Sequence, residues 1–536
     1  MVQNLIINNV KLPTDASVKE AFIVAKAKLK RLGLYSESVR FSVYRRSIDA
    51  RKKEEICFVY SILATGEFMP FDENKLSAYG ISRLLPCGDI FSKEGTEKLT
   101  APPLIVGAGP AGLFCALILA ERGYRPIVIE RGGSVAERRE AIDRLKNERI
   151  LDVDTNIQFG AGGAGTFSDG KLVTRINDSL TSIVLERFVE FGADESIKYI
   201  AKPHIGTDKL TFIVEKMVER ISELGGKVYY HTRFISPITR GDKVVGAKTS
   251  CSDISCGALI LAVGHSARDT YKTLIESGFD IESKNFSVGM RIEHRREDID
   301  RALYGKFAGD KNLGSAEYNL SADTKTRGVY TFCMCPGGVV VPAASEEGGV
   351  VVNGMSYSDR AGVNSNSAVV CSVFREDYGN TPTSAIEFQR EIERAAFIAG
   401  GKDYSAPIIT LGDFLSGKLS KEPTRVLPSY MDGGVRLARP ESYLPSFVTE
   451  GIKKALVAFG KKIRGFDDSS ALLCGAETRT SSPVRILRNT DTRLATGFSN
   501  LYPIGEGAGY AGGITSASVD GIKTALKLIS KYKSGN

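Results

Sequence analysis

The sequence predicts an α/β protein built around a Rossmann-like, dinucleotide-binding domain. A short apolar segment, 104–106, leads into the glycine turn GAGPAG at 107–112, and an apolar helical segment, 113–122, follows. A second short apolar segment, 126–129, ends directly before Glu130. Strand, glycine turn, helix, strand and acidic residue occur in the order that a dinucleotide-binding unit requires.

Length and composition are those of a globular protein with several domains. The chain has 536 residues, of which 42% are hydrophobic and 25% are charged, and this length suits three to four domains. Its longest apolar runs, such as 113–120, are far shorter than the roughly twenty residues of a membrane helix. The first residues lack the basic start and apolar core of an export signal. We therefore expect no membrane span and a cytoplasmic location.

Nine cysteines and four histidines are scattered over the chain. The odd number of cysteines, and the lack of Cys-x-x-Cys pairs, argue against both a disulfide framework and a structural zinc site. We expect a reducing compartment and no metal. The pairs Cys251 with Cys256 and Cys333 with Cys335 are interpreted as packing residues.

Residues 1–98 are expected to form a separate α+β module with a ferredoxin-like arrangement. Strands are predicted at 5–10, 39–44 and 56–63, and a helix is predicted at 17–32. Between Lys11 and Lys53 there are 12 Lys and Arg against 4 Asp and Glu, an excess equal to the net charge of +8 of the whole chain. This surface is either a solvated face or, as the minor alternative, a contact for nucleic acid or an acidic partner.

The pattern G-x-G-x-x-G occurs three times, at 107–112, 160–165 and 507–512. Only the first match is followed by an apolar helix and a second strand with an acidic end. The second runs into the polar segment TFSDGKL, which predicts a glycine loop. The third follows a strand-like segment, 501–504, but too few residues remain after it for a second nucleotide-binding domain.

The glycines of the first match have distinct mechanical roles. Gly107 permits the tight turn, Gly109 lets the backbone approach a pyrophosphate, and Gly112 lets the helix pack closely on the sheet. The helix N-terminus offers its N–H groups and positive dipole end to the phosphates. Glu130 is placed to accept both hydroxyls of an adenosine ribose.

Three motifs in order resemble the FAD signatures of glutathione-reductase-like flavoproteins: GAGPAG with Glu130, ALILAVG at 258–264, and LYPIGEGAGYAGGI at 501–514. Further segments resemble the uncharacterised bacterial FAD-utilising dehydrogenases, also called NAD(P)/FAD-dependent oxidoreductases. They are NIQFGAGGAGTFSDGKL (156–172), KPHIGTDKL (202–210), GHSARDT (264–270), CPGGVVVPA (335–343), NGMSYSDR (353–360), RPESYLPSF (439–447) and ETRTSSPVRI (477–486). The likeness covers nearly the whole chain from Leu104 onward.

The resemblance implies FAD as cofactor and assigns roles to particular residues. Glu506 would bond a ribitol hydroxyl, and Gly512 and Gly513 would begin a helix whose N-terminus faces the flavin pyrimidine. Gly264 would close a strand near the adenosine half, and a strand at 227–234 would run beside the adenine. The full expected cofactor-binding set is Gly107, Gly109, Pro110, Ala111, Gly112, Glu130, Arg131, Gly162, Gly163, Thr166, Phe167, Ser168, Phe234, Gly264, Gly505, Glu506, Gly512, Gly513 and Ile514.

Two residues are candidates for chemistry. His204 lies before a helix that Thr207 could cap, and its imidazole could act as acid or base near neutral pH; a packed or capping histidine is the alternative. Arg479 could bind an anionic substrate or a flavin carbonyl, or it could belong to an interdomain salt-bridge network. The helix after GAGPAG holds a single cysteine, Cys115, which argues against a disulfide reductase.

These observations together predict an FAD-dependent oxidoreductase that transfers a hydride through flavin N5 to or from a small organic substrate, with NAD(P)H as a donor that binds transiently. One alternative is a reductase of isoprenoid or other unsaturated lipid-like substrates. A second is a flavin-dependent RNA-binding or RNA-modifying protein that uses the basic N-terminal domain. The expected domains are an N-terminal α+β module (1–98), a discontinuous FAD-binding domain (99–284 and 479–536) and an inserted α+β substrate domain (285–478).

Overall fold

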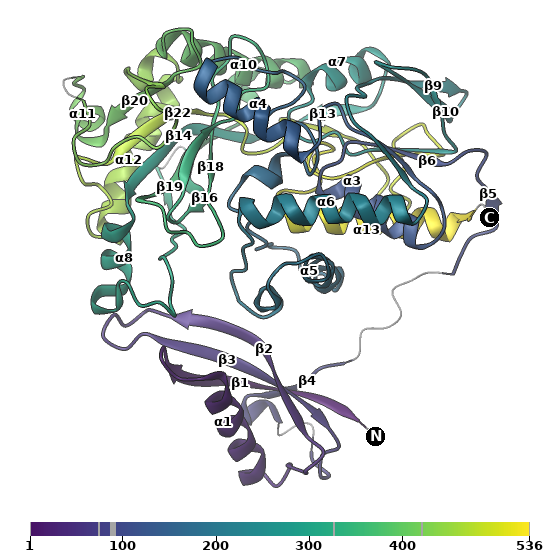
Figure 1. The fold of residues 1–536 in the computed structure, drawn as a ribbon. Coiled ribbons are helices and arrows are strands. Elements are labelled where there is room, and N and C mark those ends of the chain that lie inside the picture. The colour runs from purple at the N-terminus through teal and green to yellow at the C-terminus, as the bar shows by residue number, and fades with distance from the viewer. Residues whose placement is uncertain (1, 73–75, 86–92, 325–326, 420–421, 535–536) are drawn as a thin grey trace.

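The computed structural model describes residues 2–72, 76–85, 93–324, 327–419 and 422–534, and the elements below lie within them. It is a mixed α/β structure, as the sequence predicts. Figure 1 shows a small N-terminal module beside a larger body that holds the other sheets. Cys87 lies outside the described residues, and the other eight cysteines are unpaired. In the described part of the chain, no helix is long and apolar enough to cross a membrane.

The N-terminal module is an antiparallel sheet with one long helix packed on it. Its strand order, β2-β3-β1-β4, is that of a ferredoxin-like sheet. Ser17 is the N-cap of the helix, and the Glu20 side chain accepts the Ser17 backbone N–H at 2.9 Å. Ala21, Ala25 and Leu29 are buried. The elements are β1 (Gln3–Pro13), α1 (Val18–Arg31), β2 (Arg40–Asp49), β3 (Cys57–Gly66) and β4 (Ile81–Arg83).

A five-stranded parallel sheet forms the centre of the larger body. Its order is β24-β12-β6-β7-β8, so a strand from the C-terminal end of the chain pairs with strands near residues 104 and 260. The helices α3, α6 and α13 pack together beside it (Figure 1). The elements are β6 (Pro103–Val106), α3 (Pro110–Glu121), β7 (Ile127–Ile129), α4 (Val135–Glu148), α5 (Leu180–Glu190), α6 (Thr207–Glu223), β8 (Lys227–Tyr229), β12 (Ala258–Leu261), α7 (Arg268–Glu276), β24 (Leu501–Pro503) and α13 (Ile514–Lys531).

The prediction of a single strand at 227–234 is wrong. β8 ends at Tyr229, and β9 (Phe234–Arg240) begins a separate antiparallel sheet with β10 (Lys243–Thr249) and β11 (Ile254–Ser255). Between them, His231 has a φ of +52° and its N–H donates to the Gly132 carbonyl oxygen at 3.1 Å. This left-handed residue turns the chain away from the parallel sheet.

A mixed seven-stranded sheet, in the order β15-β16-β19-β14-β22-β20-β21, forms the remaining part of the body. α12 packs against its β14, β15, β16 and β19, and α10 packs against β20 and β22. Its elements are β14 (Phe286–Arg295), α8 (Arg296–Tyr304), β15 (Ser321–Asp323), β16 (Gly328–Cys335), β19 (Asn364–Val373), α9 (Arg375–Tyr378), α10 (Pro382–Ala399), β20 (Ala406–Thr410), α11 (Leu411–Ser416), β21 (Val435–Leu437), α12 (Ser446–Lys462) and β22 (Leu472–Glu477).

Three two-stranded pairs complete the structure, and one of them joins both ends of the body. β5 pairs with β25 in parallel, so the segment after the N-terminal module lies against the C-terminal end of the chain. The pairs are β13 (Ile281–Ser283) with β23 (Val484–Ile486), β17 (Val339–Pro342) with β18 (Val352–Met355), and β5 (Glu97–Lys98) with β25 (Tyr532–Lys533).

Candidate functional site

The glycine-rich segments that are far apart in the sequence meet at one edge of the parallel sheet. The N–H of Gly162 donates to the Ala108 carbonyl oxygen at 2.8 Å, which joins the second glycine loop to the first. A Cβ on Gly505 would lie 2.8 Å from the Ala111 Cβ, so the C-terminal glycine run lies against the start of α3. A Cβ on Gly165 would lie 2.9 Å from Ile514. The carboxyl end of a parallel sheet is where dinucleotides bind in this class of fold.

Glu130 ties these loops together. Its carboxylate accepts N–H groups from Ala108 (2.8 Å), Gly132 (3.1 Å) and Gly160 (2.9 Å), and the side chain is buried. A carboxylate has about four acceptor sites, so the backbone occupies most of them. The expected bonds to a ribose remain a prediction, and organising three loops is a role that the sequence did not suggest.

Arg138 holds the second glycine loop, and the sequence analysis missed it. The guanidinium is fully buried and donates to the carbonyl oxygens of Asn156 (3.0 Å), Ile157 (2.8 Å), Ala161 (2.5 Å) and Gly163 (3.0 Å). Burial lowers the pKa of Arg138 to about 9. A signal was present, since Arg138 shares the buried face of α4 with other buried residues, namely Val135, Ile142 and Leu145.

Space for a cofactor is left beside the C-terminal glycines. A Cβ on Gly264, Gly512 or Gly513 would meet no atom within 4 Å. By contrast, a Cβ on Gly112 would collide with the Gly107 carbonyl oxygen, so that glycine serves packing. The Thr166 hydroxyl is buried and has no hydrogen-bond partner among the described residues. Open glycine backbone and an unpaired buried hydroxyl fit a bound FAD.

Glu506 lies at the start of the last glycine run. Burial raises the pKa of its carboxyl from 4.5 to about 7, against the opposing effects of the Gly513 N–H and the Lys284 charge. The loop is fixed by Asp520, which accepts the Gly505 N–H at 2.7 Å and pairs with Arg488 at 2.8 Å. The structure therefore presents a titratable carboxyl next to the N-terminus of α13.

We expect Glu506→Gln to remove a pH-dependent loss of stability from the cofactor-free protein. Because the folded pKa is raised above 4.5, the folded state holds the proton more tightly, and stability falls as the pH rises from 4.5 through about 7. The shift is worth at most about 3 kcal/mol. Urea unfolding of the apoprotein at about pH 5 and about pH 8 should show this decline in the wild type and a smaller one in the variant. An equal decline in both would contradict the assignment.

The other expected cofactor residues are divided between loop positions and buried packing positions. Arg131 stacks over the Phe159 ring, at 4.3 Å from its centroid, and pairs with Asp269 at 2.7 Å. The Ser168 hydroxyl donates to the Gly165 carbonyl oxygen at 2.6 Å. The remaining residues lie in these elements: Pro110 and Ala111 begin α3, Gly109 precedes it, Gly163 precedes the 3-10 helix of 164–167, Phe167 ends that helix, and Phe234 is buried at the start of β9.

His204 lies in a polar cluster built around Asp169. Asp169 is fully buried and binds Lys171 (2.7 Å) and Arg360 (2.5 Å). The Nε2 of His204 lies 3.1 Å from the Ser358 carbonyl oxygen, so this nitrogen must carry the hydrogen. Burial and the Arg360 charge lower the pKa of His204, which keeps the ring neutral near pH 7. The Nδ1 lone pair is then the position that can accept a proton.

The expected cap at Thr207 is wrong. Gly206, with a φ of +87°, is the N-cap of α6, and Thr207 is the first helical residue. Its hydroxyl donates to the Thr166 carbonyl oxygen at 2.8 Å instead. Thr515 makes a similar bond from α13 to the Leu172 carbonyl oxygen at 2.8 Å. These bonds hold the segment 166–172, which contains Asp169 and Lys171, against α6 and α13.

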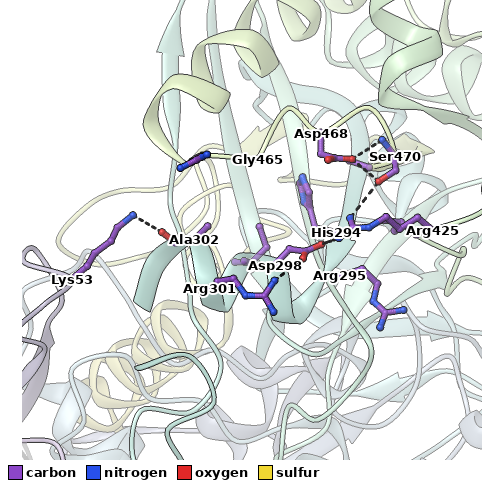
Figure 2. A pocket seen from close by; sticks show the side chains of 14 residues that line it. Lys53, His294, Arg295, Asp298, Arg301, Ala302, Arg425, Gly465, Asp468 and Ser470 are labelled. Carbon is purple, nitrogen blue, oxygen red and sulfur yellow. Dashed lines mark hydrogen bonds and ion pairs between the residues drawn. The ribbon is translucent and has the colours of Figure 1, made fainter. Parts of the chain in front are cut away.

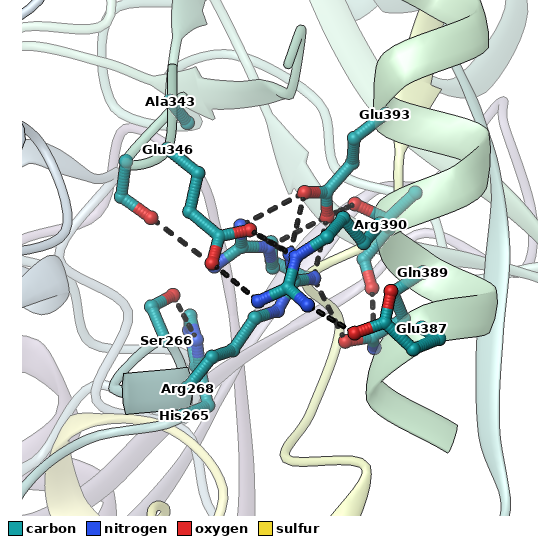
Figure 3. A network of polar contacts seen from close by, with 12 residues as sticks. His265, Ser266, Arg268, Ala343, Glu346, Glu387, Gln389, Arg390 and Glu393 are labelled. Atoms are coloured by element: carbon teal, nitrogen blue, oxygen red, sulfur yellow. Dashed lines mark hydrogen bonds and ion pairs between the residues drawn. The ribbon is translucent and has the colours of Figure 1, made fainter. Parts of the chain in front are cut away.

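Arg479 lies in a buried salt-bridge network rather than alone on a site wall. Its Nε and Nη2 donate to Glu393 at 2.7 and 2.9 Å, and Arg268 donates to the same carboxylate at 2.8 Å through each of two nitrogens. Figure 3 shows Glu393 reaching from α10 toward Arg268, with Glu346 and Arg390 alongside. The network joins α7, α10 and the segment after β22, which is the second of the two readings that the sequence left open.

Three family models match the chain. Residues 285–480 match a model described as the C-terminal domain of FAD-dependent proteins, residues 100–141 match an FAD-binding domain, and residues 4–65 match a domain of unknown function. A protein from Clostridium beijerinckii, described only as uncharacterized, is 42% identical over 532 residues, which is 98% of this chain and 98% of that protein.

Solved structures of flavoenzymes resemble the chain at a coarse level. A glycine oxidase from Bacillus cereus is 10% identical, with 81% of this chain and 99% of that chain covered and a TM-score of 0.33. An L-amino acid deaminase from Proteus vulgaris is 12% identical, with 84% and 98% covered and a TM-score of 0.33. A flavin-dependent brominase, Bmp2, is 11% identical, with 80% and 78% covered and a TM-score of 0.38.

Proposed function

Because the chain belongs to an uncharacterised family of FAD-dependent oxidoreductases, we propose that it transfers a hydride between FAD and a small organic substrate, with NAD(P)H as a transient donor. The observation that carries this proposal is the meeting of the glycine segments around open space at Gly264, Gly512 and Gly513. When bound, FAD supplies a site at flavin N5 that accepts and donates hydride.

The chain's own residues would hold the cofactor from both ends. The first glycine loop and the N-terminus of α3 would bind the pyrophosphate, and Glu130 would use its remaining acceptor site for the ribose. Gly512 and Gly513 would bring the N-terminus of α13 to the flavin, where the helix dipole favours negative charge. Glu506 would bond the ribitol chain.

We propose that the substrate binds beside the polar cluster around Asp169. The bond from Thr515 to the Leu172 carbonyl oxygen joins this cluster to the start of α13. Lys171 and Arg360 supply positive charge around Asp169, and His204 would take up or deliver a proton at Nδ1. Arg479 would position the wall of the site through Glu393. The seven-stranded sheet, within the proposed inserted domain 285–478, would then shape the substrate compartment.

The donor is tested by mixing the FAD-loaded protein with NADH and with NADPH without oxygen. We expect one of them to bleach the visible absorption of the oxidised flavin. Acceptors can then be screened by the return of that absorption. If neither nucleotide bleaches it while dithionite does, NAD(P)H is not the donor.

His204→Ala is expected to slow turnover by about 10²–10⁴-fold with FAD affinity unchanged, because general acid–base groups contribute that range. Turnover is measured with an acceptor found in the screen, and FAD affinity by fluorescence titration. His231→Asn is the control, since His231 contacts Glu137 on the exposed surface and asparagine tolerates its left-handed backbone. Unchanged turnover in His204→Ala would remove its role in proton transfer.

A further inference from the structure

A cavity lies between the N-terminal module and the larger body, and none of the residues expected to hold FAD lines it. It measures about 430 Å³ and is lined by Lys53 from the module and by the end of β14, α8 and two loops of the body. Figure 2 shows Lys53 reaching to Ala302 and the arginines Arg295, Arg301 and Arg425 around His294. The volume lies within the range of about 300–1,000 Å³ that small-molecule sites occupy.

The lining carries an excess of positive charge. Five cationic side chains, Lys53, Arg295, Arg301, Arg425 and Arg464, face two acids, Asp298 and Asp468, which leaves 5 − 2 = +3.

An acid just outside the lining, Glu297, pairs with Arg295 at 3.3 Å, so the local excess is 3 − 1 = +2. Asp298 pairs with Arg425 at 2.6 Å and with Arg301 at 3.9 Å, and Asp468 accepts the Ser470 N–H at 2.8 Å. Arg464 is exposed and makes no ion pair with any residue that the structure describes.

The lining also contains an unsatisfied buried polar atom. His294 is 3% exposed, and its Nε2 donates to the Phe466 carbonyl oxygen at 2.8 Å. Its Nδ1 is buried and has no partner in the described part of the chain. Since burial lowers the pKa of His294, the ring is neutral and Nδ1 offers a lone pair.

We infer that this cavity binds a small phosphate-bearing anion, which would bridge the N-terminal module and the body. Arginine is suited to phosphate because its planar N–H groups bind two oxygens at once. The anionic ligand would contact the positive side chains of Lys53 on the module and of Arg301 and Arg464 on the body. Its binding would therefore favour the docked position of the module, whose Lys53 Nζ already donates to the Ala302 carbonyl oxygen at 2.6 Å.

Calorimetric titration of the FAD-loaded chain, whose dinucleotide site is filled, with inorganic phosphate, pyrophosphate and ADP tests the inference. We expect saturable binding of at least one probe, weaker at high salt, and a loss of affinity of about tenfold or more in Arg464→Gln. Binding of ADP but not pyrophosphate would identify a nucleotide, and the reverse would identify a free phosphate compound. Lys53→Gln should weaken binding as well if the ligand spans both parts.

Arg240→Gln is the matched control, because Arg240 is exposed at the end of β9 and does not line the cavity. Equal affinities in Arg464→Gln and Arg240→Gln would overturn the inference. So would the absence of saturable binding of all three probes at millimolar concentration, or binding of an RNA oligonucleotide alone.

Discussion

Replacing Glu393 by glutamine is expected to lower the free energy of unfolding by about 3–5 kcal/mol, the usual cost of removing one partner from a buried ion pair. Glu393 is 2% exposed and accepts from both Arg268 and Arg479, which are also buried. Glutamine keeps the shape but not the charge, so two guanidinium groups would stay buried around a neutral side chain. Urea unfolding is followed by far-ultraviolet circular dichroism, because the chain has no tryptophan.

The pH dependence of this effect has a definite sign. The two guanidinium groups hold the pKa of Glu393 well below its usual 4.5, against the effect of burial. Its contribution to stability is therefore present above about pH 4.5 and is lost as the pH falls below it. The difference between wild type and Glu393→Gln should shrink in acid.

Glu387→Gln is the control for Glu393→Gln, since Glu387 pairs with Arg390 at the edge of the same network where its side chain is 42% exposed. A pair this exposed is worth about 0–1 kcal/mol. If Glu393→Gln costs no more than Glu387→Gln, the buried network does not hold α7 and α10 together.

Gly512→Leu is expected to leave the apoprotein folded and to weaken FAD binding by about 100-fold or more, which corresponds to about 2.7 kcal/mol. A Cβ at this position meets no protein atom within 4 Å, and the residue does not have a positive φ. The leucine side chain would thus be accommodated without strain and would fill the space that the flavin requires. FAD affinity is measured by fluorescence titration of the apoprotein, and folding by its thermal midpoint.

Gly328→Leu controls for the added side chain. Gly328 begins β16, is exposed, has no positive φ, and its Cβ would lie 3.4 Å from Ser372 Oγ alone. FAD affinity should match the wild type in this variant. If Gly512→Leu binds FAD as tightly as Gly328→Leu, the flavin does not lie at the N-terminus of α13.

The sequence could predict the elements whose signals are local. β6, the glycine turn at 107–112 and α3 follow from the spacing of Gly107, Gly109 and Gly112 and from the unbroken apolar run after them. The N-terminal helix begins after Ser17 because Ser17 and Glu20 form a capping box. The third glycine match follows β24, as its strand-like approach suggested, and leads into α13, as the resemblance to FAD signatures implied.

The features that depend on distant partners could not be predicted. The break before Phe234 depends on a left-handed His231 that bonds to Gly132. The aromatic and β-branched residues on either side of it, such as Tyr229 and Ile235, conceal the break in the sequence. Arg479 pairs with Glu393, which is distant in the sequence. The sequence alone could therefore not decide between ligand binding and a salt-bridge network for Arg479. The Asp169 cluster forms because Arg360, 191 residues later in the chain, pairs with Asp169, and no spacing in the sequence encodes that contact.

The most direct test of the account is the cofactor content of the purified full-length chain. The protein is isolated without added flavin, its visible absorption is recorded, and the material released by heat is identified by chromatography and mass spectrometry. We expect one FAD per chain, or its stoichiometric uptake by the apoprotein, and loss of that uptake in Gly512→Leu. A colourless protein that takes up no FAD would contradict it.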